Sequence, residues 1–194
     1  MKKTDTKSRL LAVGARIIRT KGYNFVGLKE ILEEAGVPKG SFYFHFKNKE
    51  DFGLRIVDIY GNYMYETLKK HFETKGKSTL IRLKRFFEEY KNYLIAKDFT
   101  EGSPLGNLCI EMADLNQAFR LKIEEQFQKI TSLLIDFLNE AKKNQELSDS
   151  FDAKTWSEFL MNSWEGTVLR SKSTKSEEPI NLFLKIWFEN LLIK

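Results

Sequence analysis

Residues 28–46 read LKEILEEAGVPKGSFYFHF, two short helical patterns separated by a glycine turn. In the first pattern, apolar residues recur at the spacing of one helix face, and the pattern stops at Gly36. In the second, Pro38 stands at the first position of a helix, where proline is best tolerated, and an aromatic-rich segment continues to Phe46. The layout predicts a helix-turn-helix over about residues 28–47, although a helical hairpin inside a core has the same spacing.

A second helix of this kind places its first residues against base edges in the major groove of DNA. Small residues there let the backbone approach a duplex, and free helix amides favour phosphate. Lysine suits guanine edges and phosphates, and hydroxyl or imidazole groups suit backbone oxygens. The residues predicted to contact DNA are Lys29, Lys39, Gly40, Ser41, Tyr43, His45 and Lys49.

The excess positive charge of the chain lies in the same region. The 194 residues include 32 basic and 27 acidic side chains, a net charge of +5. Residues 1–51 hold 11 of the basic and 6 of the acidic ones, which leaves 21 of each sign for residues 52–194. A basic head on a neutral body predicts a polyanionic partner, because neutralised phosphates release counterions. A solvated basic terminus is the alternative.

The rest of the chain shows helical periodicity and no sustained alternation of the kind that strands show. One helix is predicted before the helix-turn-helix, ending at Gly22, and six after it. The fold class is therefore predicted to be all-α with about nine helices. We expect residues 1–50 to form a DNA-binding head and residues 51–194 to form a body that binds an effector and dimerises. The six later helices are expected at about 48–72, 80–94, 104–112, 127–141, 152–168 and from 179 onward.

The stretch around the helix-turn-helix also carries a family signature. It begins with Gly22 and an aromatic residue, continues through Ala35-Gly36-Val37, and ends with Tyr-x-His-Phe at 43–46 followed by Lys49-Glu50. This pattern resembles the signature of the TetR family, the tetracycline-repressor type of regulator. The resemblance implies a three-helix DNA-binding head, a divergent helical body with an effector pocket, and a homodimer built on the last two helices.

Three positions depart from the family pattern. Gly27 and Pro38 stand where members often have a hydroxyl-bearing residue, and Leu32 stands where a smaller residue is common. Gly27 remains acceptable as an N-cap and Pro38 as a first helical residue, so we expect both helices to form. The departures remove two hydroxyl groups that would otherwise contact phosphate.

The resemblance also directs attention to two sets of residues in the body. An effector pocket needs mostly apolar walls with a few polar groups, although an aromatic stripe at helical spacing is also typical of an ordinary core. The residues predicted to contact an effector are Tyr63, Tyr90, Asn107, Cys109, Glu111, Met112 and Trp164. Broad apolar stripes on the last two helices predict a dimer interface. The residues predicted to form it are Trp156, Phe159, Trp164, Phe183 and Trp187.

Other chemistries find little support in the sequence. Cys109 is the only cysteine, so it forms no intramolecular disulfide and fits a cytoplasmic protein; it is interpreted as a small apolar group, with thiol sensing as the alternative. His45 and His71, the only histidines, are expected too far apart to share a metal ion. No apolar run reaches the length of a membrane span. Neither a catalytic triad nor a phosphate-binding loop is present, so we predict no enzyme and no cofactor.

The sequence therefore favours a repressor that binds a pseudo-palindromic operator as a dimer and leaves it when a small-molecule effector binds. Two alternatives stay open. One is a small-molecule carrier or enzyme whose basic head serves only solubility, and the other is an architectural protein that binds DNA without a ligand.

Overall fold

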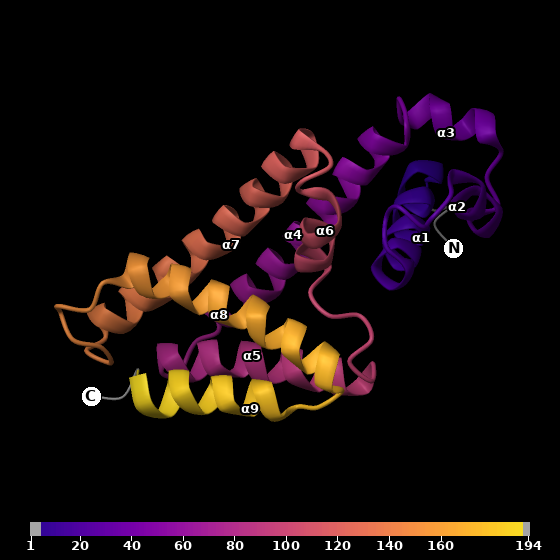
Figure 1. The fold of residues 1–194 in the computed structure, drawn as a ribbon. Coiled ribbons are helices and arrows are strands. Elements are labelled where there is room, and N and C mark those ends of the chain that lie inside the picture. Colours follow the sequence, from indigo (N-terminus) through magenta and orange to yellow (C-terminus); the bar gives the residue numbers. More distant parts are fainter. Residues whose placement is uncertain (1–4, 192–194) are drawn as a thin grey trace. The chain divides into compact units, whose positions relative to one another are not determined.

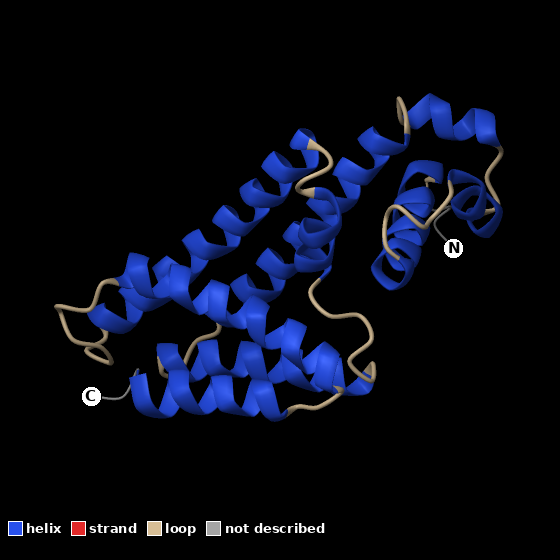
Figure 2. Ribbon diagram, viewed as in Figure 1, coloured by secondary structure: helices blue, strands red, loops and turns tan. Residues whose placement is uncertain are grey.

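The computed structural model describes the backbone of residues 5–191, and every regular element in that range is a helix (Figures 1 and 2). The predicted all-α fold is confirmed. The last helix continues as a π-helix over Ile186–Leu191. The helices are α1 (Thr6–Lys21), α2 (Leu28–Ala35), α3 (Lys39–His45), α4 (Lys49–Glu73), α5 (Thr79–Ala96), α6 (Pro104–Met112), α7 (Gln117–Lys143), α8 (Ala153–Thr174) and α9 (Glu178–Lys185).

The chain divides into two compact units. Unit 1 consists of Met1–Asn62 and Pro104–Gln126, and unit 2 consists of Tyr63–Ser103 and Phe127–Lys194. Unit 1 therefore contains α6 and parts of α4 and α7 in addition to the head predicted for residues 1–50. None of the described helices is long and apolar enough to cross a membrane.

The core of unit 1 holds the short helix α3 in place. Phe42 and Phe46 are both buried, and their ring centroids lie 5.5 and 5.0 Å from that of Phe52 on α4. Gly14 on α1 leaves room for the Phe52 ring, because a Cβ atom at Gly14 would lie 2.3 Å from Phe52 Cζ. The aromatic cluster thus joins α1, α3 and α4.

The core of unit 2 is built on α5, α8 and α9. Trp164 of α8 is buried against Phe87 of α5 and Phe183 of α9, with ring centroids 4.8 and 5.1 Å away. Trp187 is also buried, and its indole N–H donates to the Ser163 hydroxyl at 3.0 Å. The apolar stripes of α8 and α9 are therefore largely used to pack these helices within one protomer.

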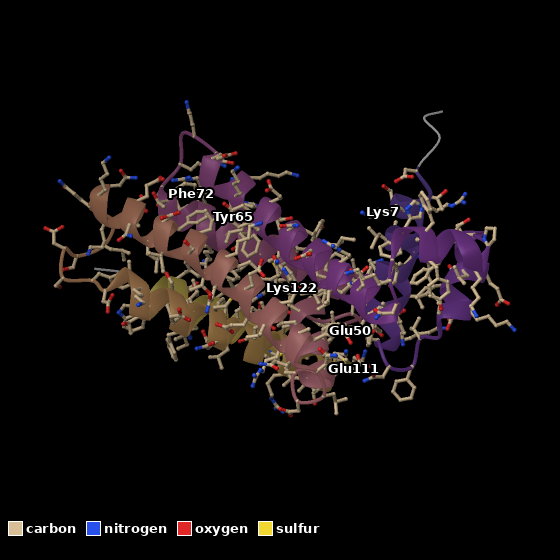
Figure 3. The ribbon with its side chains drawn as sticks, turned by 90° about the horizontal axis from the view of Figure 1, so that it is seen from above. Lys7, Glu50, Tyr65, Phe72, Glu111 and Lys122 are labelled. Carbon is tan, nitrogen blue, oxygen red and sulfur yellow. The ribbon has the colours of Figure 1, made fainter. Side chains whose placement is uncertain are left out.

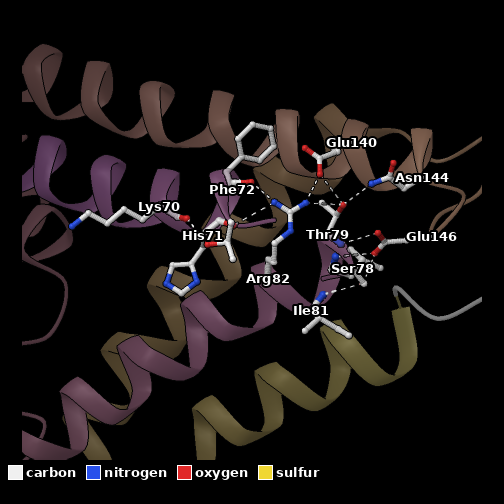
Figure 4. A network of polar contacts seen from close by, with 12 residues as sticks. Lys70, His71, Phe72, Ser78, Thr79, Ile81, Arg82, Glu140, Asn144 and Glu146 are labelled. Atoms are coloured by element: carbon white, nitrogen blue, oxygen red, sulfur yellow. Dashed lines mark hydrogen bonds and ion pairs between the residues drawn. The ribbon is translucent and has the colours of Figure 1, made fainter. Parts of the chain in front are cut away.

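A buried arginine on α5 ties this helix to α4 and α7 within unit 2 (Figure 4). The guanidinium of Arg82 forms an ion pair with Glu140 of α7 and donates to the backbone oxygen of Phe72 on α4. It also donates to the Thr79 hydroxyl at 3.1 Å, and Asn144 donates to the same hydroxyl at 3.0 Å. The buried guanidinium is thus paired with a half-buried carboxylate, as a charge in a core requires.

The start of α5 is capped by a carboxylate from a distant part of the chain. Glu146 accepts hydrogen bonds from the Ser78 hydroxyl at 2.6 Å and from the backbone N–H groups of Thr79 and Leu80 at 2.7 and 2.9 Å. Burial alone would raise the pKa of Glu146, but these hydrogen bonds hold the pKa below its ordinary value. The ionised form is therefore the one that stabilises the fold.

We expect Glu146→Gln to lower the free energy of unfolding by about 1–2 kcal/mol at neutral pH, because the free N–H groups of α5 lose a charged acceptor. Because the pKa of Glu146 is lower in the folded chain, this contribution is present above the ordinary carboxyl range and is lost as pH falls through the folded pKa. Urea unfolding of both proteins at several pH values measures it. A difference that stayed constant down to acid pH would contradict the assignment.

Candidate nucleic-acid interface

The turn between α2 and α3 has the geometry that a helix-turn-helix needs. Gly27 is the N-cap of α2, as expected. Gly36 ends that helix in the left-handed region, with φ of 60°, and its N–H donates to the backbone oxygen of Glu33 at 3.1 Å. Pro38 adopts an extended conformation and is the N-cap of α3, whereas it was predicted to be the first residue inside that helix. The chain thus reverses between two short helices over Gly36–Pro38.

The outer face of α3 is open to solvent. Phe42 points into the core, whereas Lys39, Gly40, Tyr43 and Phe44 are exposed. Positions 40, 43 and 44 share one side of the helix, since residues three and four apart lie above one another. The structure therefore presents the predicted contact residues Lys39, Gly40 and Tyr43 together, and it adds Phe44, which the sequence analysis did not single out.

A groove of about 830 Å³ lies between α2 and α3 in unit 1. Lys29 and Lys39 both line it, and Glu33 carries the negative charge in its wall. The Lys29 ammonium lies 3.7 Å from the Glu33 carboxylate, and both side chains are exposed. The lining residues are Leu28, Lys29, Leu32, Glu33, Gly36, Val37, Pro38, Lys39 and Tyr43.

The other residues predicted to contact DNA are engaged in contacts within the protein or are partly buried. Ser41 and His45 are half-buried, and the His45 ring packs edge-on against Phe44 with centroids 5.0 Å apart. The Lys49 ammonium donates to the backbone oxygen of Tyr23 at 2.7 Å and lies 4.3 Å from the centre of the Tyr23 ring. Lys49 therefore holds the loop between α1 and α2 as well as carrying charge.

That loop is also held by Glu111 of α6. The two carboxylate oxygens of Glu111 accept hydrogen bonds from the backbone N–H groups of Tyr23 at 2.8 Å and Asn24 at 2.5 Å. Figure 3 labels Glu111 and Glu50, the two carboxylates whose charges act on the Tyr23 hydroxyl. Glu111 was predicted as an effector contact, but its carboxylate is engaged with the loop between α1 and α2.

Burial and charge shift two pKa values at this junction. Burial, reinforced by the negative charges of Glu50 and Glu111, raises the pKa of Tyr23 to about 12. Burial lowers the pKa of Lys49, and the nearby Glu111 carboxylate opposes that shift. The buried Tyr23 ring also packs on Phe119 of α7 at 4.8 Å, so the loop is fixed by both polar and aromatic contacts.

Comparison with known proteins agrees with this geometry. Residues 10–56 match the family model described as bacterial regulatory proteins, tetR family, and residues 79–187 match the tetracyclin repressor-like C-terminal domain. The transcriptional regulator AcuR of Cereibacter sphaeroides is 35% identical over 91% of this chain and 80% of its own length. The chain belongs to the TetR family. Its resemblance to that family, inferred from the helix-turn-helix, is confirmed.

Further relatives and solved structures of TetR-family proteins cover the whole fold. The transcriptional repressor NemR of Escherichia coli is 26% identical over 91% of this chain and 88% of its own length. The crystal structure of reduced E. coli NemR covers 98% of both chains with a TM-score of 0.87 and 26% identity. A regulatory protein TetR from Rhodobacter sphaeroides has a TM-score of 0.84, 33% identity, and coverage of 91% of this chain and 94% of its own.

The other predicted effector contacts of this TetR-family chain lie in both units. Tyr63 is exposed on α4, and Asn107, Cys109 and Met112 are half-buried or buried on α6. In unit 2, Tyr90 and Trp164 pack edge to face, with centroids 5.3 Å apart. The buried indole N–H of Trp164 has no hydrogen-bond partner among the described residues.

Glu165, next to Trp164, is a polar group that the sequence analysis missed. The Ser103 hydroxyl donates to its carboxylate at 2.9 Å. Burial raises the pKa of Glu165 to about 7, and the hydrogen bond from Ser103 only partly opposes this. Its partner lies 62 residues away in the sequence, so no local pattern marked it.

The residues predicted for the dimer interface fall into two groups. Trp164, Phe183 and Trp187 are buried within unit 2. Trp156 is half-buried, and Phe159 is 51% exposed on the outer side of α8. Of the five, Phe159 is therefore the one that the fold of a single protomer leaves most available to a second chain.

We expect Glu111→Ala to accelerate amide hydrogen exchange at Tyr23 and Asn24, because both N–H groups lose their acceptor. The free energy of unfolding should fall by about 1–3 kcal/mol, the usual cost of unpaired polar groups. Exchange measured by NMR tests this, with Asp114→Ala, an exposed carboxylate in the same unit, as the control. Unchanged exchange at both amides would show that Glu111 does not hold the loop.

Proposed function

We propose that this chain is a repressor that binds a pseudo-palindromic operator as a homodimer in the cytoplasm and is released by a small-molecule effector. The observation that carries the proposal is the outer face of α3, where Lys39, Gly40 and Tyr43 are exposed beside the α2–α3 groove. A helix presented in this way fits the major groove, and the surrounding lysines suit phosphate. The relatives AcuR and NemR, described as a transcriptional regulator and a repressor, support it.

The operator is best obtained by selecting bound sequences from a random duplex library at a stated salt concentration. We expect two related half-sites about one helical turn apart, because each head of a dimer reads one major groove. Binding without any sequence preference would instead support an architectural protein. No binding at low salt would support a carrier or enzyme and would overturn the proposal.

On the selected operator, Lys39→Ala and Tyr43→Ala should each weaken binding by about 1–3 kcal/mol, because each removes a contact to a base or phosphate. Loss of a phosphate contact also lowers the salt dependence of the affinity. Titration at several salt concentrations measures both effects. Lys154→Ala, which removes an exposed lysine from α8, is the matched control and should bind as the unmodified protein does.

The dimer is proposed to form through the outer sides of α8 and α9. Phe159, Leu182 and Ile186 are 51%, 61% and 39% exposed there, and large exposed apolar groups on neighbouring helices are typical of an interface. Gly166 lies on the same side of α8 as Phe159, seven residues further along. A Cβ atom at Gly166 would meet nothing within 4 Å in the part of the protomer that the structure describes, so the small size of Gly166 gives room for another chain.

We expect the double substitution Phe159→Glu and Leu182→Glu to raise the dimer dissociation constant at least about 100-fold, because charges would replace buried apolar anchors. Sedimentation velocity measures the association state. Both side chains are exposed in the protomer, so the fold should survive, which circular dichroism checks. Leu121→Glu, at a 58% exposed leucine of α7, is the control. A double variant that remained dimeric would exclude this surface.

In unit 2 we propose that Tyr90, Trp164 and Glu165 contribute to the effector site. Burial raises the pKa of the Glu165 carboxyl group to about 7, and this group accepts a hydrogen bond from the Ser103 hydroxyl. Such a group either accepts a hydrogen bond or donates one, which suits a polar effector in mostly apolar surroundings. An effect of about 1–3 kcal/mol on operator affinity is sufficient for regulation.

A further inference from the structure

The outer face of α3 carries a large apolar side chain that the fold does not use. Phe44 is 85% exposed, on the side of the helix opposite to the buried Phe42. Its close aromatic neighbour is the adjacent His45 ring, with centroids 5.0 Å apart. Removing this ring from water would be favourable, so a partner that covered it would gain affinity.

Gly40 stands one helical turn before Phe44 and has no internal reason to be glycine. Among residues 5–191, a Cβ atom there would meet nothing within 4 Å, and the φ of Gly40 lies in the range that any residue adopts. Glycine is a poorer helix former than alanine. An external group that approaches the α3 backbone accounts for this choice, since a Cβ atom would stand in its way.

The charges around the two residues indicate the kind of partner. Lys39 and Lys47 are exposed next to this face, and unit 1 contains the basic head of the chain. An apolar ring bordered by lysines fits a surface that is apolar at one point and anionic around it. The major groove has this character, because thymine presents a methyl group at C5 among base edges flanked by phosphates.

We propose that Gly40 and Phe44 form the contact for the 5-methyl group of a thymine in each operator half-site. The bare backbone at Gly40 lets the base edge approach, and the Phe44 ring covers the methyl group. This inference rests on the proposed function and adds to it the base that α3 distinguishes by an apolar contact. It predicts a thymine at a fixed position of each half-site.

The test replaces each thymidine of the selected operator in turn with deoxyuridine, which lacks only the methyl group. The unmodified protein should bind about fourfold more weakly per half-site at one position, the value expected for exposing one methyl group. Phe44→Ala should bind thymidine and deoxyuridine operators equally. Phe25→Ala, which removes a 90% exposed phenylalanine of the same head from outside α3, should keep the fourfold difference.

Gly40→Ala supplies a second test that does not depend on removing the ring. The substitution should leave the protein at least as stable, because alanine is the better helix former, and should weaken operator binding. A uniform affinity for thymidine and deoxyuridine operators, or an unchanged deoxyuridine penalty in Phe44→Ala, would overturn the inference while leaving the proposed function intact. Failure to select any operator would overturn both.

Discussion

The packing of Phe42 and Phe46 on Phe52 is the contact on which the DNA-binding head depends. Helix α3 has seven residues, too few for a helix to be stable by itself in water. Phe42 and the residue that follows the helix, Phe46, are buried against Phe52 of α4, and Gly14 of α1 makes space for the Phe52 ring. Because the inner face alone anchors the helix, the outer face is free to carry the residues proposed to contact DNA.

The head is also tied to the helix α6, which lies far from it in the sequence. Glu111 satisfies two backbone N–H groups of the α1–α2 loop, and Lys49 at the start of α4 satisfies the Tyr23 carbonyl. Helix α4 contributes residues to both compact units. Hydrogen bonds to charged groups are worth about 1.5–3 kcal/mol, the same size as a typical coupling energy between an effector and an operator. A displacement of α4 or α6 that disturbed these few contacts would therefore be enough to change DNA affinity.

The features predicted well from sequence were those encoded over a few neighbouring residues. The N-cap Gly27, the turn at Gly36 and the helical pattern around them are local, so the helix-turn-helix and the all-α class followed directly. The role of Glu111 was out of reach because its partners lie 87 and 88 residues away. The burial of Trp164 within one protomer shows a different limit of prediction from sequence. Helical periodicity indicates that a side of a helix is covered, but it does not say whether the same protomer or a second one covers it.

Glycines inside helices help to distinguish a helix side that the same protomer covers from one that another molecule covers. A neighbouring side chain of the protomer accounts for some of these glycines and not for others. At Gly14, Gly53 and Gly61 a Cβ atom would collide with a neighbouring side chain at 2.1–2.5 Å, so the fold of one protomer requires glycine there. At Gly40 and Gly166 a Cβ atom would meet no neighbouring group of the described residues within 4 Å, although alanine is the better helix former. The contacts proposed above, with DNA at α3 and with a second chain at α8, would account for glycine at these two positions. One of these glycines lies on the basic face of α3 and the other beside exposed apolar residues of α8, so the first suits DNA and the second suits a second copy of the chain.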